Sequence, residues 1–196
     1  NFSSASATIR NCIITEIENS DVILLYNSSP IFENCLIYNN ENNVFDFSNN
    51  NSPTIINCTI TGNSNFGTNE SWDYTPIPTY KNCIIYNNSV NPSSMNIFGN
   101  VKITYSLVEG GWSQMGNINA DPLFVDPEND NFSLQSGSPC IDAGDPDLDG
   151  DGISWQFDID DQDWDGTQLD MGYYGYDACD NCGVCDRDQS NNCVPD

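Results

Sequence analysis

The sequence predicts an all-β solenoid, in which the chain winds as a stack of similar coils. Within residues 1–118 the pair Asn-Cys occurs four times with spacings of 23, 23 and 25 residues, at Cys12, Cys35, Cys58 and Cys83. A fixed period in the low twenties, made of short apolar runs joined by Asn, Ser and Gly, is typical of a protein that stacks one coil per repeat. Helical signals are almost absent, because no stretch carries a capped i, i+3, i+4 apolar stripe.

Each coil is expected to place one strand on either side of its Asn-Cys bend. The residue three positions before each cysteine is large and apolar, and so is the residue two positions after it. A fifth coil fits the same spacing, with Ser106 in the place of the cysteine. Side chains alternate along a strand, so these residues and the cysteine point inward. The inward residues are Ile9, Phe32, Ile55, Tyr80 and Ile103 before the bend, and Ile14, Ile37, Ile60, Ile85 and Val108 after it.

A further strand per coil is expected at residues 22–25 and 44–47, and more weakly at 72–74 and 96–98. The 25-residue step adds two residues, which we place in a bulged loop at 67–78.

The predicted organisation is about five coils over residues 1–118, a capping segment over 119–177 and a loop-rich, cysteine-containing tail over 178–196. Because a solenoid needs capped ends and residue 1 already lies at the edge of a coil, we expect the C-terminal part of a longer or processed chain.

The abundant asparagines allow two interpretations. Triplets such as Asn27-Ser28-Ser29 and Asn69-Glu70-Ser71 would be glycan acceptors in a eukaryotic secretory pathway. Alternatively, Asn suits tight bends and stacks as hydrogen-bonded ladders from coil to coil. The triplet that begins at Asn57 contains the inward Cys58, which favours the ladder.

The net charge excludes one class of partner. The chain carries 4 basic and 29 acidic residues and no His, for a formal charge of −25. Nucleic-acid binding is therefore not expected, because phosphate recognition needs a basic footprint. Membrane insertion is not expected either, since no apolar run approaches the length of a membrane span. The acidic residues are uneven, with 8 in 1–100 and the remaining 21 in 101–196.

The clearest chemical signal lies in residues 145–166. Two hexads of the form D-x-D-x-D-G begin at Asp147 and Asp161, and Asp158 falls at position 12 of the first loop. Carboxylates at alternate positions, followed by a Gly for the sharp turn, wrap oxygen ligands around Ca²⁺. The flanking helices of an EF-hand are missing. The candidate calcium ligands are Asp145, Asp147, Asp149, Asp151, Asp158, Asp161, Asp163 and Asp165.

The alternative for this segment is a solvated acidic loop that only keeps the protein soluble. That alternative has a cost, because carboxylates this close repel one another unless a cation or solvent screens them.

The cysteines form two groups. Those of the coils are expected to be reduced thiols that act as small hydrophobes, since side chains in register on parallel strands meet disulfide geometry poorly. The second group has the spacing C-x2-C-x2-C and comprises Cys179, Cys182, Cys185 and Cys193. A four-thiolate zinc or iron–sulfur site is one interpretation of that spacing. Its acidic surroundings favour two disulfides in an exported protein, with three pairings open.

Two rows of side chains should point out of the coils just after the cysteine ladder. They are Ile13, Leu36, Thr59, Ile84 and Leu107, and then Thr15, Tyr38, Thr61, Tyr86 and Glu109. An apolar stripe on a surface is usually covered or sticky. Three interpretations stay open: residues 119–146 fold back over it, it contacts another subunit or surface partner, or its tyrosines stack on sugar rings. The candidate partner or sugar face is Leu36, Tyr38, Ile84 and Tyr86.

The Asn-Cys coils resemble the right-handed parallel β-helix repeats of the pectate-lyase-like superfamily. Residues 119–127 and 132–146 resemble the C-terminal end segment of many secreted bacterial proteins with that fold, and 170–175 resembles its closing strand. The tail at 182–186 is similar to cysteine-rich, calcium-associated linkers of bacterial surface proteins. The resemblance implies a right-handed parallel β-helix and export to the cell surface. It implies much less about activity, because this fold hosts lyases, hydrolases, adhesins and inert scaffolds.

Lyases of that superfamily hold calcium against a uronate with acidic residues and use an Arg or Lys base. Here Asp46 and Asp73 could lie on neighbouring coils near Glu70, but no base is visibly paired with them. The basic residues are Arg10, Lys81, Lys102 and Arg187. We therefore expect a non-catalytic, extracellular structural or adhesive module, stabilised by calcium, on a bacterial cell surface or in an extracellular assembly that includes self-assembly. The alternative is a carbohydrate-active protein, either lyase-like or polysaccharide-binding.

Overall fold

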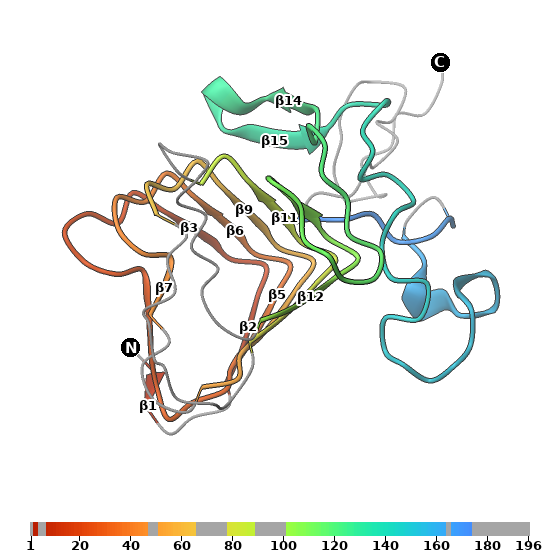
Figure 1. Ribbon diagram of the computed structural model, residues 1–196, viewed down its shortest axis with the longest axis horizontal. Helices are drawn as coiled ribbons and strands as arrows, with labels where there is room; N and C mark the ends of the chain where they lie inside the picture. Colours follow the sequence, from red (N-terminus) through yellow and green to blue (C-terminus); the bar gives the residue numbers. More distant parts are fainter. Residues whose placement is uncertain are drawn as a thin grey trace, which may run out of the picture.

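The computed structural model describes residues 2–3, 7–46, 51–65, 78–88, 101–163 and 166–173, which wind as a parallel β-solenoid with a cap on one flank (Figure 1). Among these residues no helix is long and apolar enough to cross a bilayer.

Two five-stranded parallel sheets meet at each Asn-Cys bend. The sheet before the bend has the order β12 (Lys102–Thr104), β10 (Thr79–Lys81), β8 (Thr54–Ile56), β5 (Ile31–Glu33) and β2 (Thr8–Arg10). The sheet after the bend has the order β13 (Leu107–Val108), β11 (Ile84–Tyr86), β9 (Thr59–Thr61), β6 (Leu36–Tyr38) and β3 (Ile13–Thr15). The third face has β1 (Phe2–Ser3), β4 (Ile23–Tyr26) and β7 (Phe45–Asp46).

The register of these sheets is the one that the repeat predicts. Ile9 pairs with Phe32, Phe32 with Ile55, and Ile55 with Tyr80, so equivalent residues stack on successive coils. About five coils are therefore confirmed on two faces, and the strands expected at 22–25 and 44–47 are confirmed by β4 and β7. The weaker strands expected at 72–74 and 96–98 lie outside the described residues.

The bend explains why Asn precedes each cysteine. Asn11, Asn34, Asn57 and Asn82 have φ values of 53°, 51°, 49° and 52°, in the left-handed region. Asn reaches this region at lower cost than most residues, because its short polar side chain can bond locally.

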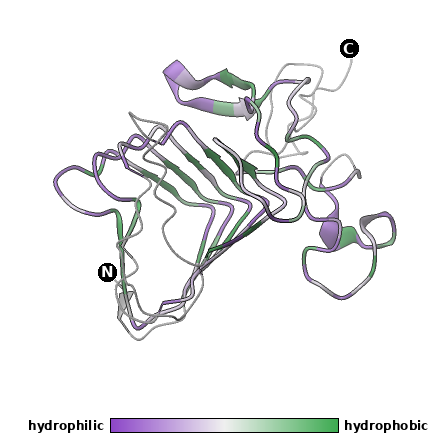
Figure 2. Cartoon of the chain, in the orientation of Figure 1, coloured by the Kyte–Doolittle hydropathy of each residue, from purple (hydrophilic) through white to green (hydrophobic). Residues whose placement is uncertain are grey.

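The inward rows form the core between the sheets, as Figure 2 shows by the hydrophobic colouring along the strands. Phe32, Ile55, Tyr80 and Ile103 are buried before the bend, and their partners after it are buried too, except in the first coil, where Ile9 and Ile14 are half-buried. Phe45 packs edge-on between Phe32 and Tyr80, with ring centroids 5.7 and 6.3 Å away.

Two polar ladders run along the solenoid inside this frame. The Cys35 amide donates to Cys58 Sγ at 3.4 Å, and the Cys83 amide donates to Ser106 Oγ at 3.0 Å. Cys12, Cys35, Cys58, Cys83 and Cys140 are unpaired thiols, as predicted for the coils. The predicted asparagine ladder lies at the next corner, where Asn40 Nδ2 donates to Asn63 Oδ1 and Asn63 Nδ2 donates to Asn88 Oδ1, each at 2.8 Å.

The cap covers the outward side of the second sheet. It contains an antiparallel hairpin of β14 (Phe124–Asp126) and β15 (Asn131–Leu134), joined by the 3-10 turn η2 (Pro127–Asn129). In Figure 1 the hairpin lies beside the sheet that contains β6, β9 and β11. A second hydrophobic cluster joins the two, formed by Leu36, Ile84, Leu107, Phe124, Phe132, Leu134, Cys140 and Met171. Two further 3-10 turns follow, η3 (Trp155–Phe157) and η4 (Ile159–Asp161).

This cluster corrects part of the expected partner or sugar face. Leu36 and Ile84 are each 1% exposed, because the cap packs on them. They are therefore core residues of this fold, and the interpretation in which the chain folds back over its own apolar stripe is confirmed. Tyr38 and Tyr86 are half-buried at the edge of the cluster.

Candidate metal centre

The acidic loop that was predicted to bind calcium is fastened to the bend of the fourth coil. The Asp145 amide donates to Asn82 Oδ1 and the Gly172 amide donates to Asn82 O, each at 2.7 Å. Next to Asn82, Lys81 Nζ donates to Leu148 O at 3.0 Å. A side chain at Gly144 would meet the backbone of Leu169 and would lie 2.9 Å from Asn82 Nδ2, so this close approach requires glycine.

Within the loop, aspartates fold the backbone into consecutive turns. Four of them accept the amide two residues ahead, at distances from 2.7 to 3.2 Å: Asp145 from Asp147, Asp149 from Asp151, Asp151 from Ile153, and Asp158 from Asp160. Such Asx turns use one carboxylate oxygen to shape the chain. The alternate spacing of the aspartates therefore has a conformational role, whether or not a metal is bound.

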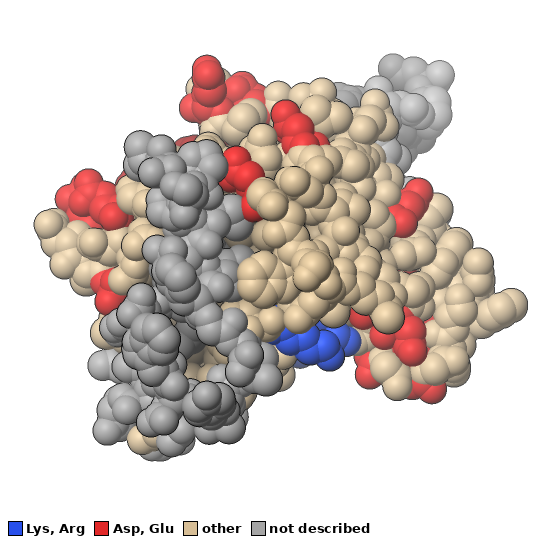
Figure 3. Space-filling model, in the orientation of Figure 1, with Lys and Arg blue, Asp and Glu red and all other residues tan. Residues whose placement is uncertain are grey.

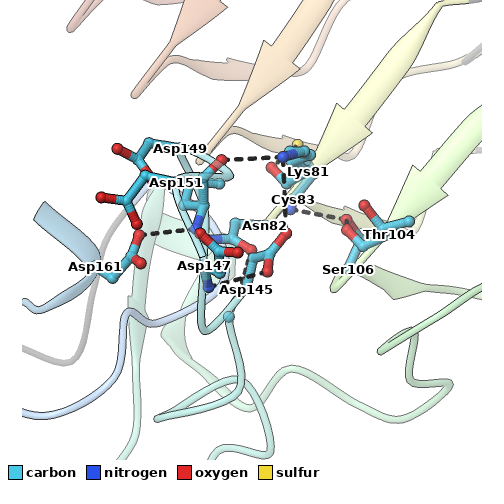
Figure 4. Close-up of polar contacts among 12 residues, drawn as sticks. Lys81, Asn82, Cys83, Thr104, Ser106, Asp145, Asp147, Asp149, Asp151 and Asp161 are labelled. Atoms are coloured by element: carbon cyan, nitrogen blue, oxygen red, sulfur yellow. Dashed lines mark hydrogen bonds and ion pairs between the residues drawn. The ribbon is translucent and has the colours of Figure 1, made fainter. Parts of the chain in front are cut away.

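These turns bring the carboxylates of both hexads together. One ligand oxygen each from Asp147, Asp149 and Asp161 lie within 4.8 Å of one another, and the same holds for Asp149, Asp151 and Asp158. Asp149 belongs to both groups. Figure 4 shows the carboxylates of Asp149, Asp151 and Asp161 on the side of the loop away from Lys81. The sequence contains two hexads, and the structure brings Asp161 of the second beside Asp147 and Asp149 of the first.

Asp161 is the most deeply buried member of the cluster. It is 0% exposed, its Oδ1 accepts the Leu148 amide at 2.8 Å, and its Oδ2 is buried without a hydrogen-bond partner among the described residues. Burial raises the pKa of Asp161, the Leu148 amide lowers it, and the charges of Asp158, Asp149 and Asp147 raise it further. A buried carboxylate beside other carboxylates needs a proton or a cation to offset its charge.

Asp145, a predicted calcium ligand, also contacts the fourth coil. It belongs to none of the described groups of three carboxylates that could hold a metal ion. Asp145 is 8% exposed, and its Oδ2 lies 3.8 Å from Lys81 Nζ. Burial raises the pKa of Asp145, while the amide of Asp147 and the charge of Lys81 lower it. Its contacts anchor the loop to the solenoid.

A third group contains residues that sequence reasoning missed. Asp163 joins Asp142 and Asp170, with one ligand oxygen each within 4.8 Å. Asp170 Oδ1 accepts the Asp142 amide at 2.8 Å, and Thr167 Oγ1 donates to Asp142 Oδ1. Asp142 and Asp170 lie outside the D-x-D-x-D-G pattern, so no local motif marks them.

The other predicted site residues lie outside the described residues. They are Asp165 and the tail cysteines Cys179, Cys182, Cys185 and Cys193. Their roles as a calcium ligand and as disulfide partners stay predictions.

A groove of about 370 Å³ lies between the hairpin and the corner of the solenoid that follows β6, β9 and β11. Tyr86, Asn87, Asp121, Phe132 and Gln135 are among the residues that line it. Tyr38 does not line the groove, because its ring packs on Phe132 with centroids 5.0 Å apart. Burial, Asp121 and Glu109 raise the pKa of Tyr86, so its hydroxyl stays protonated over the physiological range.

Comparison with known families decides what kind of solenoid this is. A family model described as a right handed beta helix region matches residues 1–121. The chain belongs to the right-handed β-helix family. The matched span contains every strand of the three parallel sheets, and the acidic loop follows it. No curated protein and no solved structure matches the chain. For this right-handed β-helix, function must therefore be argued from its sites.

Proposed function

We propose that this right-handed β-helix is a non-catalytic structural or adhesive module of an extracellular bacterial surface protein or assembly, and that its acidic loop binds calcium. The observation that carries the proposal is the cluster of Asp147, Asp149 and Asp161, in which Asp161 is fully buried and its Oδ2 has no described hydrogen-bond partner.

The chemistry of the cluster favours calcium among common cations. All candidate ligands are carboxylate oxygens, which suit hard cations, and flexible loops suit calcium better than the strict octahedron of magnesium. Thiols and imidazoles, which softer metals prefer, are absent from the three described clusters. Calcium modules outside cells commonly have Kd values of about 10⁻⁴ to 10⁻³ M.

The position of the loop supports a structural role. It continues directly from the cap segment that buries Leu36, Ile84 and Leu107, and it is bonded to the fourth coil. A cation there would hold the cap against the flank of the solenoid. The formal charge of −25 also suits a protein that must stay soluble in a calcium-rich medium. On the face shown in Figure 3, acidic side chains occur at several places and basic ones in one small patch.

Thermal unfolding tests this proposal. We expect EDTA to lower the Tm and excess Ca²⁺ to restore it, with Mg²⁺ restoring less. Asp161→Asn should lose this response to calcium. Asp160→Asn is the matched control and should keep it, because Asp160 is exposed and belongs to none of the described clusters. A melting curve that EDTA leaves unchanged would refute calcium stabilisation.

The groove beside the hairpin favours a second candidate function, the binding of a polysaccharide. Tyr86 offers an aromatic face, and Asn87, Asp121 and Gln135 offer hydrogen-bonding groups around it. The nearby carboxylates disfavour uronates and favour neutral sugars.

Titration with neutral glycans should therefore show binding that Tyr86→Ala abolishes and Tyr38→Ala affects less. Incubation with polyuronates, followed by ultraviolet absorbance of unsaturated products, tests the lyase alternative directly.

A further inference from the structure

One peptide group lies between the candidate calcium cluster and the solenoid. The Leu148 amide donates to Asp161 Oδ1 at 2.8 Å, and the Leu148 carbonyl accepts from Lys81 Nζ at 3.0 Å. Lys81 is the last residue of β10, so its backbone is fixed by strands on both sides. Figure 4 shows Lys81 on the solenoid side of this loop, with Asp161 on the opposite side.

The lysine is held rather than free to move. Its side chain is 24% exposed and also lies 3.8 Å from Asp145 Oδ2, while the neighbouring Asn82 accepts the amides of Asp145 and Gly172. The two ends of the acidic loop, at Asp145 and Gly172, therefore both bond to Asn82, and Lys81 next to it bonds to Leu148.

We infer that Lys81 is a positioning residue for the calcium site, and that calcium binding and docking of the loop on the solenoid strengthen each other through Leu148. The inference rests on the proposed binding of calcium by Asp147, Asp149 and Asp161. Lys81 fixes the Leu148 peptide, whose amide holds one oxygen of Asp161. The carboxylate is thereby oriented before the cation arrives, which lowers the ordering cost of binding.

The coupling must be reciprocal. If a docked loop binds calcium more tightly, then calcium favours the docked loop by the same factor. Calcium should therefore protect contacts on the solenoid side of the loop, which involve none of Asp147, Asp149 and Asp161, as well as the ligand turns themselves.

Charge alone predicts the opposite effect of removing Lys81. A positive side chain near the cluster repels Ca²⁺, so its loss would raise the affinity if Lys81 acted only through its charge. Positioning predicts a lower affinity. Lys102 is the matched control: it lies on the next strand, β12, is exposed, and its charge also lowers the pKa of Asp145. The structure shows no bond from Lys102 to the described part of the loop.

Calorimetric titration of the full chain with CaCl₂ tests the inference. We expect Lys81→Met to weaken calcium binding about tenfold, the effect of losing one hydrogen bond to a charged donor. Lys102→Met should bind as tightly as the unmodified chain or more tightly, and Lys81→Arg should recover part of the loss. Equal or tighter binding by Lys81→Met, with the β-sheet signal in circular dichroism intact, overturns the inference.

Hydrogen exchange of the unmodified chain provides a test that needs no variant. Calcium should slow exchange at the amides of Asp145 and Gly172, which bond to Asn82, together with the amide of Leu148. Slowing at the ligand turns 147–153, Leu148 included, without slowing at the amides of Asp145 and Gly172 overturns the coupling but leaves the proposed function standing. A chain that does not bind calcium at all defeats the proposed function itself.

Discussion

The coils and the acidic loop are held together by different forces. In the coils, equivalent apolar residues stack in register, and the inward rows from the second coil onward are almost completely buried. The loop places aspartates at alternate positions and leaves two large apolar side chains in solvent, with Phe157 86% and Ile159 81% exposed. Burial of apolar surface stabilises the coils. The acidic loop instead consists of turns that carry like charges. The coils should therefore fold without a cation, and the loop should depend on one.

The largest expected effect would come from placing a charge under the cap. Ile84→Asp should reduce the free energy of unfolding by about 4 kcal/mol or more, because it buries an unpaired carboxylate in the second hydrophobic cluster.

Ile13→Asp is the control for this change. Ile13 occupies the same outward row in the first coil but is 55% exposed, so its change should cost about 0.5 kcal/mol or less. Urea denaturation would measure both. Equal losses would mean that the cap does not cover the stripe.

A smaller loss is expected from breaking the asparagine ladder inside the coils. Asn63→Ala removes an amide that bonds to Asn40, Asn88 and two backbone carbonyls, and should cost about 3 kcal/mol. The loss should be the same in EDTA and in calcium, because the ladder belongs to the coils. A calcium-dependent loss would argue against separate stabilisation of the two regions.

The acidic loop should show the reverse dependence. At 10 mM Ca²⁺ and a Kd of about 10⁻⁴ to 10⁻³ M, binding should stabilise the chain by about 1.4 to 2.7 kcal/mol. Asp161→Asn should abolish that increment, whereas Asp160→Asn should retain it. In EDTA, Asp161→Asn should equal or exceed the stability of the unmodified chain, because it removes a buried charge. Denaturation with and without calcium separates these outcomes.

The smallest effect concerns pH. Because the pKa values of Asp161 and Asp145 are raised in the folded chain, the folded state binds protons more readily than the unfolded state. In EDTA, stability should therefore increase as the pH falls through the folded-state pKa values toward the ordinary pKa of a carboxyl group, and this stabilisation is lost again as the pH rises through the folded-state pKa values.

In calcium the trend should reverse, because protons compete with the cation for the carboxylates. The increase in EDTA should be weaker in Asp161→Asn. A stability that falls with decreasing pH in EDTA would contradict the raised pKa values.

The sequence predicted the coils well because their information is local and repeated. The side-chain period of two places Phe32 and Ile37 inward on either side of a bend that Asn34 permits, and each further coil repeats the pattern. The D-x-D-x-D-G spacing also located the acidic loop correctly.

Non-local geometry could not be predicted. The grouping of Asp161 with Asp147 and Asp149 depends on two 3-10 turns between them, and Asp142 meets Asp170 through the path of the cap. The contact of Lys81 with Leu148 spans 67 residues, and no spacing marks it. Asp145 fits the acidic pattern, but its contacts with Lys81 and Asn82 on the fourth coil could not be predicted from that pattern.

The hairpin fixes where this solenoid tolerates a change of length. Its apolar side chains bridge Leu36, Ile84 and Leu107, which belong to the second, fourth and fifth coils. Inserting a whole repeat between those coils would pull the bridged residues apart by one strand spacing, about 4.8 Å. An additional repeat placed ahead of Leu36 would leave every bridged residue where it is. Duplication of coils is therefore compatible with the packing of the hairpin only on the N-terminal side of Leu36. The hairpin thus fixes the number of coils from the second to the fifth.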